Sequence, residues 1–156
     1  MKLKIVVVGR DRNDPIIDAA DEYLGRLGRY TPVELVEVRE SPLKKGRSVL
    51  EAQRTEAERL RKSINQEGLR VALDEHGRAQ TSVQLAERVR RWTDDGVQRV
   101  SLFIGGPSGL HPEIVKEAHE TWALSRFTLP HRVARLIVCE QMYRAFTILR
   151  GEPYHK

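Results

Sequence analysis

The chain has 156 residues, of which 40% are hydrophobic and 31% are charged. These values indicate a globular protein with one core, and we expect a single domain over residues 1–156. The formal net charge is +5, which suits a polyanionic partner but does not require one. No apolar run approaches the length of a membrane span, and the single cysteine, Cys139, excludes an internal disulfide.

The first segment is interpreted as a strand. Residues 2–9 combine charge with a short apolar run, but the run is too short for a signal peptide and no small-residue cleavage site follows. We therefore expect a cytoplasmic protein. Asp14 can then cap a helix whose first turn holds Pro15, and Gly28 marks the end of that helix.

Apolar periodicity predicts strands alternating with helices along the rest of the chain. Strands are expected at 2–9, 32–38, 70–73, 97–104 and 122–127, and helices at 15–27, 49–64, 82–92, 112–120 and 131–149. A sharp turn is expected at 74–78, and Val83 is expected to face inward on the following helix. The helix at 49–64 has few apolar anchors, namely Leu50, Ala57, Leu60 and Ile64. This alternation predicts an α/β fold with a mostly parallel sheet flanked by helices.

Residues 39–48 read Arg-Glu-Ser-Pro-Leu-Lys-Lys-Gly-Arg-Ser and form a basic loop. A solvated linker is the favoured interpretation of such a segment. A flap that contacts phosphate is the alternative, and the residues alone leave it open.

Glycines follow the expected strand at 97–104, in the segment Gly105-Gly106-Pro107-Ser108-Gly109. The segment has neither the closing Lys-Ser/Thr of a Walker loop nor the spacing of a dinucleotide fingerprint. A tight turn is one interpretation. The other is a ligand site, because open α/β sheets bind ligands beyond the carboxyl ends of their strands, where bare backbone is accessible.

The helix expected at 131–149 is apolar on nearly every face, so we expect it to be buried all round. In a small protein this favours a homodimer that packs the helix against its own copy. Glu140 and Arg144 are spaced to form an ion pair within it. From residue 121 onward six cations face two anions, which accounts for +4 of the net charge.

The histidines show no metal-ligand spacing, so no metal is predicted. The C-terminal tail has an unusual composition, because Tyr154, His155 and Lys156 place a ring, a proton-transfer group and a cation on adjacent positions. Terminal residues are usually frayed. Here their chemistry favours a functional interpretation.

Several segments together resemble the ribosomal RNA large subunit methyltransferase H family, a minimal branch of the SPOUT superfamily. The resemblance covers the whole chain. The residues that carry it are Leu73-Asp74, Ile104 to Gly109, Leu124 to His131, Glu140 to Ala145 and Gly151 to Lys156.

The resemblance implies an α/β fold whose C-terminal part is threaded as a trefoil knot, and a homodimer. It also implies an S-adenosylmethionine-dependent enzyme that methylates N3 of a pseudouridine in large-subunit (23S) rRNA of the assembled ribosome. The cofactor contacts implied by match are Leu73, Gly105, Leu124, Ser125, Arg126, Phe127, Thr128 and Leu129.

For the chemistry we hypothesise that Tyr154 stacks on the target base and that His155 acts as the base or as an orienting donor. Arg135 or Lys156 would hold a phosphate or the developing anion. Arg132, Arg144 and Lys156 are the candidate RNA contacts. The competing hypothesis is a non-enzymatic module that binds RNA or the ribosome, because phosphate contacts need only lysine and arginine.

Overall fold

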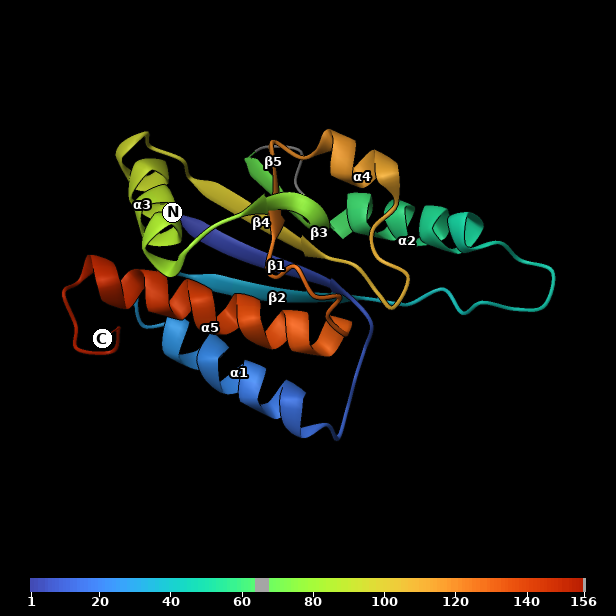
Figure 1. Cartoon of the computed structure of the whole chain (residues 1–156), viewed down its shortest axis with the longest axis horizontal. Coiled ribbons are helices and arrows are strands. Elements are labelled where there is room, and N and C mark those ends of the chain that lie inside the picture. Colours follow the sequence, from blue (N-terminus) through green and yellow to red (C-terminus); the bar gives the residue numbers. More distant parts are fainter. Residues whose placement is uncertain (64–67, 156) are drawn as a thin grey trace.

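The structure is a computed structural model, and it describes residues 1–63 and 68–155. Five parallel strands form one sheet in the order β2-β1-β4-β3-β5 (Figure 1). In chain order the elements are β1 (Lys2–Val8), α1 (Pro15–Leu27), β2 (Val33–Val38), α2 (Val49–Ser63), β3 (Leu69–Ala79), α3 (Ser82–Asp94), β4 (Arg99–Ile104), α4 (Pro112–Glu117), β5 (Glu120–Ala123) and α5 (His131–Leu149). The predicted α/β class and the parallel sheet are confirmed.

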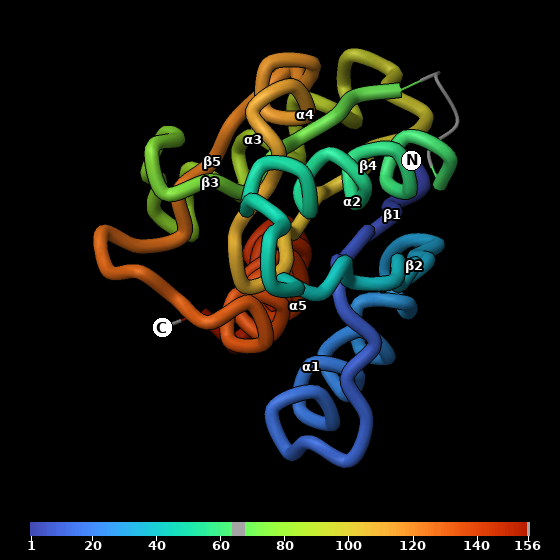
Figure 2. Tube along the Cα trace, turned by 90° about the vertical axis from the view of Figure 1, so that its right-hand side faces the viewer, coloured from blue at the N-terminus to red at the C-terminus, as the bar shows by residue number. Residues whose placement is uncertain are grey.

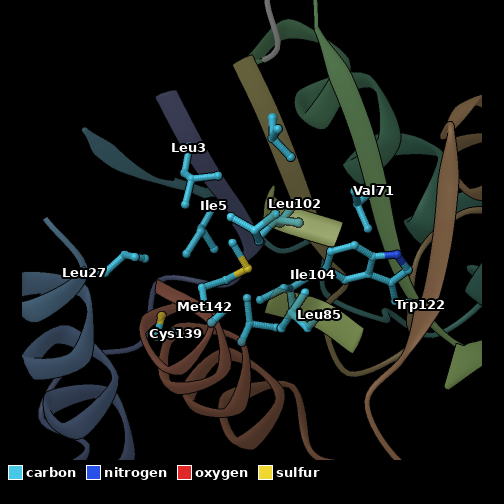
Figure 3. Packing of buried hydrophobic residues seen from close by; sticks show 14 of the residues in the cluster. Leu3, Ile5, Leu27, Val71, Leu85, Leu102, Ile104, Trp122, Cys139 and Met142 are labelled. Atoms are coloured by element: carbon cyan, nitrogen blue, oxygen red, sulfur yellow. The ribbon is translucent and has the colours of Figure 1, made fainter. Parts of the chain in front are cut away.

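Helices cover both faces of the sheet, which is why the central strands are apolar on both sides. On β1, Leu3 and Ile5 face a core shared with α1, α3 and α5, whereas Val6 and Val8 face a second core shared with α2 and α4. Figure 3 shows the first core, where the side chain of Met142 on α5 meets the sheet residues.

Side-chain caps fix the starts of two helices, and the cap at Asp14 is the one that the sequence predicts. Asp14 caps α1 by accepting a hydrogen bond from the backbone nitrogen of Ile16 at 2.8 Å. Thr81 and Gln84 form a capping box at the start of α3. These local contacts fix where α1 and α3 begin, and both begin where the sequence predicts.

Strand β3 differs from the prediction. The chain leaves the sheet after Leu73, but it rejoins at Arg78, and both of these residues pair with Trp122 of β5. Asp74 accepts a hydrogen bond from the backbone nitrogen of His76 at 2.9 Å, which closes the short excursion. The sharp turn is therefore a bulge inside a longer strand.

Strand β5 is also shorter than predicted. It ends at Ala123, which pairs with Ala79, the last residue of β3. No part of β3 remains to pair with residues 124–127, so the predicted strand at 122–127 is confirmed only for 122–123, and residues 124–127 form a loop. The length of β5 is set by the length of its partner strand β3, and the sequence of 122–127 holds no information about that partner.

Two burial predictions are wrong. Val83 on α3 is 55% exposed and Leu50 on α2 is 49% exposed, because both lie in the first turn, beyond the sheet. Ile64, another predicted anchor of α2, lies outside the described residues. Six residues of α5 are buried within the single chain. Burial of its other faces against a second copy stays a prediction.

The carboxyl ends of all five strands lie at one edge of the sheet, because the strands are parallel. Figure 2 looks onto this edge. The segments that follow β1, β2, β3, β4 and β5 all start there, so loops far apart in sequence share one face of the molecule.

Candidate cofactor pocket and C-terminal tail

An apolar cavity of about 150 Å³ lies at the carboxyl edge, between the sheet and the helices α3 and α5. Its polar side chains are Gln80, Thr81 and Gln141, together with the indole N–H of Trp122, which donates to Glu120. The lining residues are Leu73, Gln80, Thr81, Leu85, Leu102, Trp122, Ala123, Leu124, Ile137, Val138, Gln141 and Met142.

Two of the predicted cofactor contacts, Leu73 and Leu124, line this cavity. The predicted run continues from Leu124 as a loop away from the sheet, and its middle is solvent-exposed, with Phe127 at 83%. The loop is held locally, because the backbone nitrogen of Phe127 donates to Ser125 Oγ at 2.9 Å and Thr128 donates to Glu75 at 3.3 Å. The structure thus brings Leu73 together with the start of the loop.

Gly105 does not line the cavity, but it fixes the turn beside it. A Cβ at Gly105 would lie 2.4 Å from the carbonyl carbon of Gly109 and 2.6 Å from the nitrogen of Leu110. The turn is closed by a 2.9 Å hydrogen bond from Gly109 N to Gly106 O. Glycine is therefore required at 105 by the close approach of backbone to backbone.

Residues of α5 that the sequence analysis did not single out form one wall of the cavity. Gln141 accepts a hydrogen bond from Ser82 at 2.6 Å and donates to Glu140 at 2.7 Å. Ile137 and Gln141 are four residues apart and so share one face of the helix. That spacing was visible in the sequence, but nothing in it pointed to the loop at 124–129 as the neighbour.

Tyr154 is packed against its own chain. Its ring lies edge-on to Tyr143 with a centroid distance of 4.8 Å, and the Arg144 guanidinium lies 4.6 Å from the ring centroid. Its hydroxyl donates to Glu140 at 3.0 Å and lies within hydrogen-bond distance, 3.2 Å, of the Tyr23 hydroxyl. Burial, together with these two hydrogen bonds, raises the pKa of Tyr154 above its usual value.

A hydrogen-bonded chain therefore runs from the tail to the pocket wall. It passes from Tyr154 to Glu140, then to Gln141 and Ser82. The tail is also held by Tyr30, whose hydroxyl donates to Glu152 at 2.5 Å. These contacts tie the end of the described chain to α1 and α5, in contrast to a frayed terminus.

Arg135, a predicted catalytic residue, lies away from the apolar cavity. Its guanidinium donates to Glu37 and Asp21, both at 2.8 Å, and its side chain is 4% exposed. It lines a second, polar pocket of about 380 Å³ with Arg10 and Arg12. Burial opposes the charge on Glu37, but hydrogen bonds from Arg12 and Arg135 outweigh it and hold the pKa of Glu37 below its usual value.

The predicted RNA contacts carry intramolecular partners. Arg132 is exposed but is paired with Asp11 and Asp14, each at 2.7 Å. Arg144 forms the predicted ion pair with Glu140, with Nε 2.9 Å from the carboxylate. Lys156 lies outside the described residues. Any phosphate bound by these two arginines would share them with carboxylates.

Residues 1–63 and 68–155 contain neither a metal-ligand cluster nor a helix that could span a membrane. No group of three or more His, Cys, Asp or Glu side chains there is arranged to hold a metal ion. No helix in the same part of the chain has the length and apolar character needed to cross a membrane.

Comparison with known proteins gives relatives over the full length. A protein from an Anaeromyxobacter species named "Ribosomal RNA large subunit methyltransferase H" is 52% identical over 156 residues, covering 100% of both chains. A protein of the same name from Syntrophomonas wolfei is 40% identical, again over 100% of both chains.

Solved structures share the fold at low sequence identity. A probable methyltransferase from Bordetella pertussis aligns with a TM-score of 0.60 at 15% identity, covering 92% of this chain and 95% of that one. A probable methylase family protein from Haemophilus influenzae aligns with a TM-score of 0.57 at 16% identity, covering 99% and 70%. A family model described as "Predicted SPOUT methyltransferase" matches residues 1–155. The chain therefore belongs to the SPOUT methyltransferase family, within the group of proteins named ribosomal RNA large subunit methyltransferase H.

Proposed function

We propose that this protein methylates large-subunit ribosomal RNA with S-adenosylmethionine as the methyl donor, at N3 of a pseudouridine in the assembled ribosome. One observation carries the proposal beyond family membership. The apolar cavity brings Leu73 of β3 together with Leu124, the start of the loop expected to bind the cofactor. The names of the relatives, which cover the whole chain, support rRNA as the substrate.

The cavity suits the adenine base of this cofactor. A cavity of about 150 Å³ with apolar walls admits one aromatic ring, and Leu73, Leu124 and Ile137 provide such walls. Gln80 and Gln141 offer amide groups for the polar edge of a base. The remainder of the cofactor would lie along residues 125–129, where Arg126 and Phe127 are exposed.

Bound S-adenosylmethionine would supply an electrophilic methyl group on a sulfonium. The chain must then exclude water, align the acceptor nitrogen and remove its proton. We assign the removal of this N3 proton to His155, which would accept it as the base. The Nδ1 atom of His155 lies 3.4 Å from Arg144 Nη1. Tyr154, with its raised pKa, stays neutral. Its ring is suited to stacking on the base, and its present contacts hold His155 beside Arg144.

Arg135 would contribute to the reaction by holding α5 in place and not by touching the substrate. Its side chain holds α5 against α1 and β2 through Asp21 and Glu37. Arg132, Arg144 and Lys156 remain the proposed RNA contacts.

The protein would work in the cytoplasm as one domain whose C-terminal part is threaded as a trefoil knot.

The active form would be a homodimer with α5 at its interface. Val133, Ile137 and Ile148 on this helix are only partly buried in the single chain, so an apolar stripe is left to cover. The loop at 124–129 and the tail lie toward opposite ends of α5 in Figure 1. The helix has nineteen residues and spans about 28 Å at 1.5 Å per residue. Antiparallel packing of two copies would bring the tail of one to the loop of the other.

Complementation between two inactive variants tests this arrangement. One variant lacks residues 154–156, and the other carries Leu124→Arg in the cavity wall. Each alone should transfer little methyl to ribosomes. Mixed dimers, formed by co-expression, should regain activity, because they contain one intact pocket facing one intact tail. A deletion variant that keeps full activity by itself would show that the tail has no part in the reaction.

The competing function is a non-enzymatic module that binds RNA or the ribosome. The net charge of +5 would serve it equally well. Calorimetry with S-adenosylmethionine separates the two, because a pure binding module has no reason to take up the cofactor. Saturable binding that is lost in Leu124→Arg supports the enzyme, and absence of binding supports the module.

A further inference from the structure

The basic loop at 39–48 forms an arm that projects from the carboxyl edge of the sheet (Figure 1). It follows β2 and leads into α2. Viewed onto that edge in Figure 2, the arm shares the face with the loop at 124–129 and with the segment after β4. It therefore lies on the side of the molecule where the proposed substrate would approach.

The base of the arm is built from buried polar contacts. Glu56 of α2 is 6% exposed and Ser41 is 4% exposed, and the backbone nitrogen of Ser41 donates to Glu56 at 2.8 Å. Arg47 closes the arm across its base by donating to Ser41 Oγ at 2.8 Å and to Thr55 Oγ1 at 2.5 Å. Burial of a carboxylate is unfavourable unless hydrogen bonds compensate it. The buried Glu56 and its hydrogen bond from Ser41 therefore indicate an ordered base and not a flexible linker.

The base of the arm is also joined to the turn beside the cavity. Gln53, in the second turn of α2, donates from its side-chain amide to the carbonyl oxygen of Ser108 at 2.6 Å. Arg59 donates to the carbonyl oxygen of Arg39 at 2.6 Å. The arm is thus held at a fixed place relative to the proposed cofactor pocket.

The tip of the arm, Leu43 to Gly46, has no such partners. The side chains of Lys44 and Lys45 are exposed and make no hydrogen bond or ion pair with any described residue. Leu43 beside them is 56% exposed. The arm carries four cations against one anion, Glu40. Lys44 and Lys45 thus have no partner among the described residues, although the base of the arm that carries them is fixed by hydrogen bonds. Arg132 and Arg144, in contrast, already have carboxylate partners.

We propose that the arm at 39–48 is an RNA-docking element that binds ribosomal RNA phosphates through Lys44 and Lys45. The inference rests on the proposed rRNA substrate. The lysines would neutralise backbone phosphates and release counterions, which adds affinity without reading sequence. The held base would lower the entropy lost when the arm binds. The arm therefore acts in binding the ribosome and takes no part in the chemical step.

Charge reversal at the tip, Lys44→Glu with Lys45→Glu, tests the proposal against a matched control. The control is Lys62→Glu with Lys116→Glu, which makes the same change in net charge. Both control lysines are exposed, and neither pairs with a described carboxylate. They lie near the ends of α2 and α4, which run back to the amino edge of the sheet. Thermal unfolding of both variants confirms that they fold.

Two measurements are made on each protein. The first is methyl transfer to 70S ribosomes from a strain lacking this protein, with kcat and KM separated. The second is the salt dependence of binding to protein-free 23S rRNA. We expect the arm variant to raise KM about tenfold with kcat unchanged and to lower the salt slope by about 2, since each phosphate contact contributes about 1. The control should resemble the unaltered protein in both.

Equal KM and equal salt slope for the arm variant and the control would overturn the proposal. A raised KM with an unchanged salt slope would also overturn it, because the arm would then contact a ribosomal protein. If the unaltered protein transfers no methyl group, the proposed function fails, and the salt slope on 23S rRNA still decides the role of the arm.

Discussion

Replacing Gly105 by alanine tests the account of the turn beside the cofactor pocket. The added methyl group would lie 2.4 Å from the carbonyl carbon of Gly109 and 2.6 Å from the nitrogen of Leu110. Both are backbone atoms, so no side chain can rotate away to make room. Overpacking costs about 1–3 kcal/mol. We expect about 3 kcal/mol here, because relief requires breaking the hydrogen bond between Gly109 and Gly106.

Gly25→Ala is the matched control, since it makes the same chemical change in the opposite environment. Gly25 lies inside α1 and a Cβ there meets nothing within 4 Å. Alanine is favoured over glycine in a helix by about 1 kcal/mol, so this variant should be more stable than the parent. Urea unfolding measures both free energies, and calorimetry at a temperature where both variants are folded measures cofactor affinity.

The two variants should thus shift stability in opposite directions, and only Gly105→Ala should weaken cofactor binding. If Gly105→Ala unfolded at the same urea concentration as the parent, the close approach of the two backbone segments would be wrong. If it were less stable but bound the cofactor normally, the turn would have no part in shaping the pocket.

Three further predictions concern buried groups. Arg135→Leu should lower the free energy of unfolding by about 3 kcal/mol, the low end for breaking a buried ion pair, because Glu37 keeps Arg12 as a partner; a loss below about 1 kcal/mol would contradict this. The pKa of Glu37 is held below its usual 4.5. The ionised carboxylate therefore stabilises the folded protein at pH values above 4.5, and this stabilisation is lost as the pH falls through the lowered pKa. The free energy of unfolding in urea should depend less on pH in Glu37→Gln than in the parent protein. Burial raises the pKa of Cys139 to about 12, so a thiol reagent should label it only on unfolding, and rapid labelling of the folded protein would be inconsistent with its burial.

Much of the fold could be predicted from local signals. The boundaries of α5 and the cap of α1 follow from apolar spacing and from Asp14 beside Pro15. The errors in the strands have a common cause, because the ends of β3 and β5 depend on which strand pairs with which. The rejoining of β3 at Arg78, opposite Trp122, is a non-local event that no short window reports.

The candidate site shows the same division. Leu73 and Leu124 were placed at strand ends by position and by family resemblance, and they do line one cavity. The contribution of Gln141 depends on the packing of α5 beside α3, where Ser82 donates to it, and that packing follows only from the fold. The sequence also could not show that Tyr154 packs on Tyr143, because that contact depends on how the tail turns back onto α5.

The central claim is methyl transfer to large-subunit rRNA. The most direct measurement incubates the protein with S-adenosylmethionine carrying a labelled methyl group and with ribosomes from a strain lacking the protein, and then maps the labelled nucleotide. We predict label at N3 of one pseudouridine in 23S rRNA, and we expect this labelling to require intact residues 154–156. Absence of label from rRNA, or label in ribosomal protein instead, would contradict it.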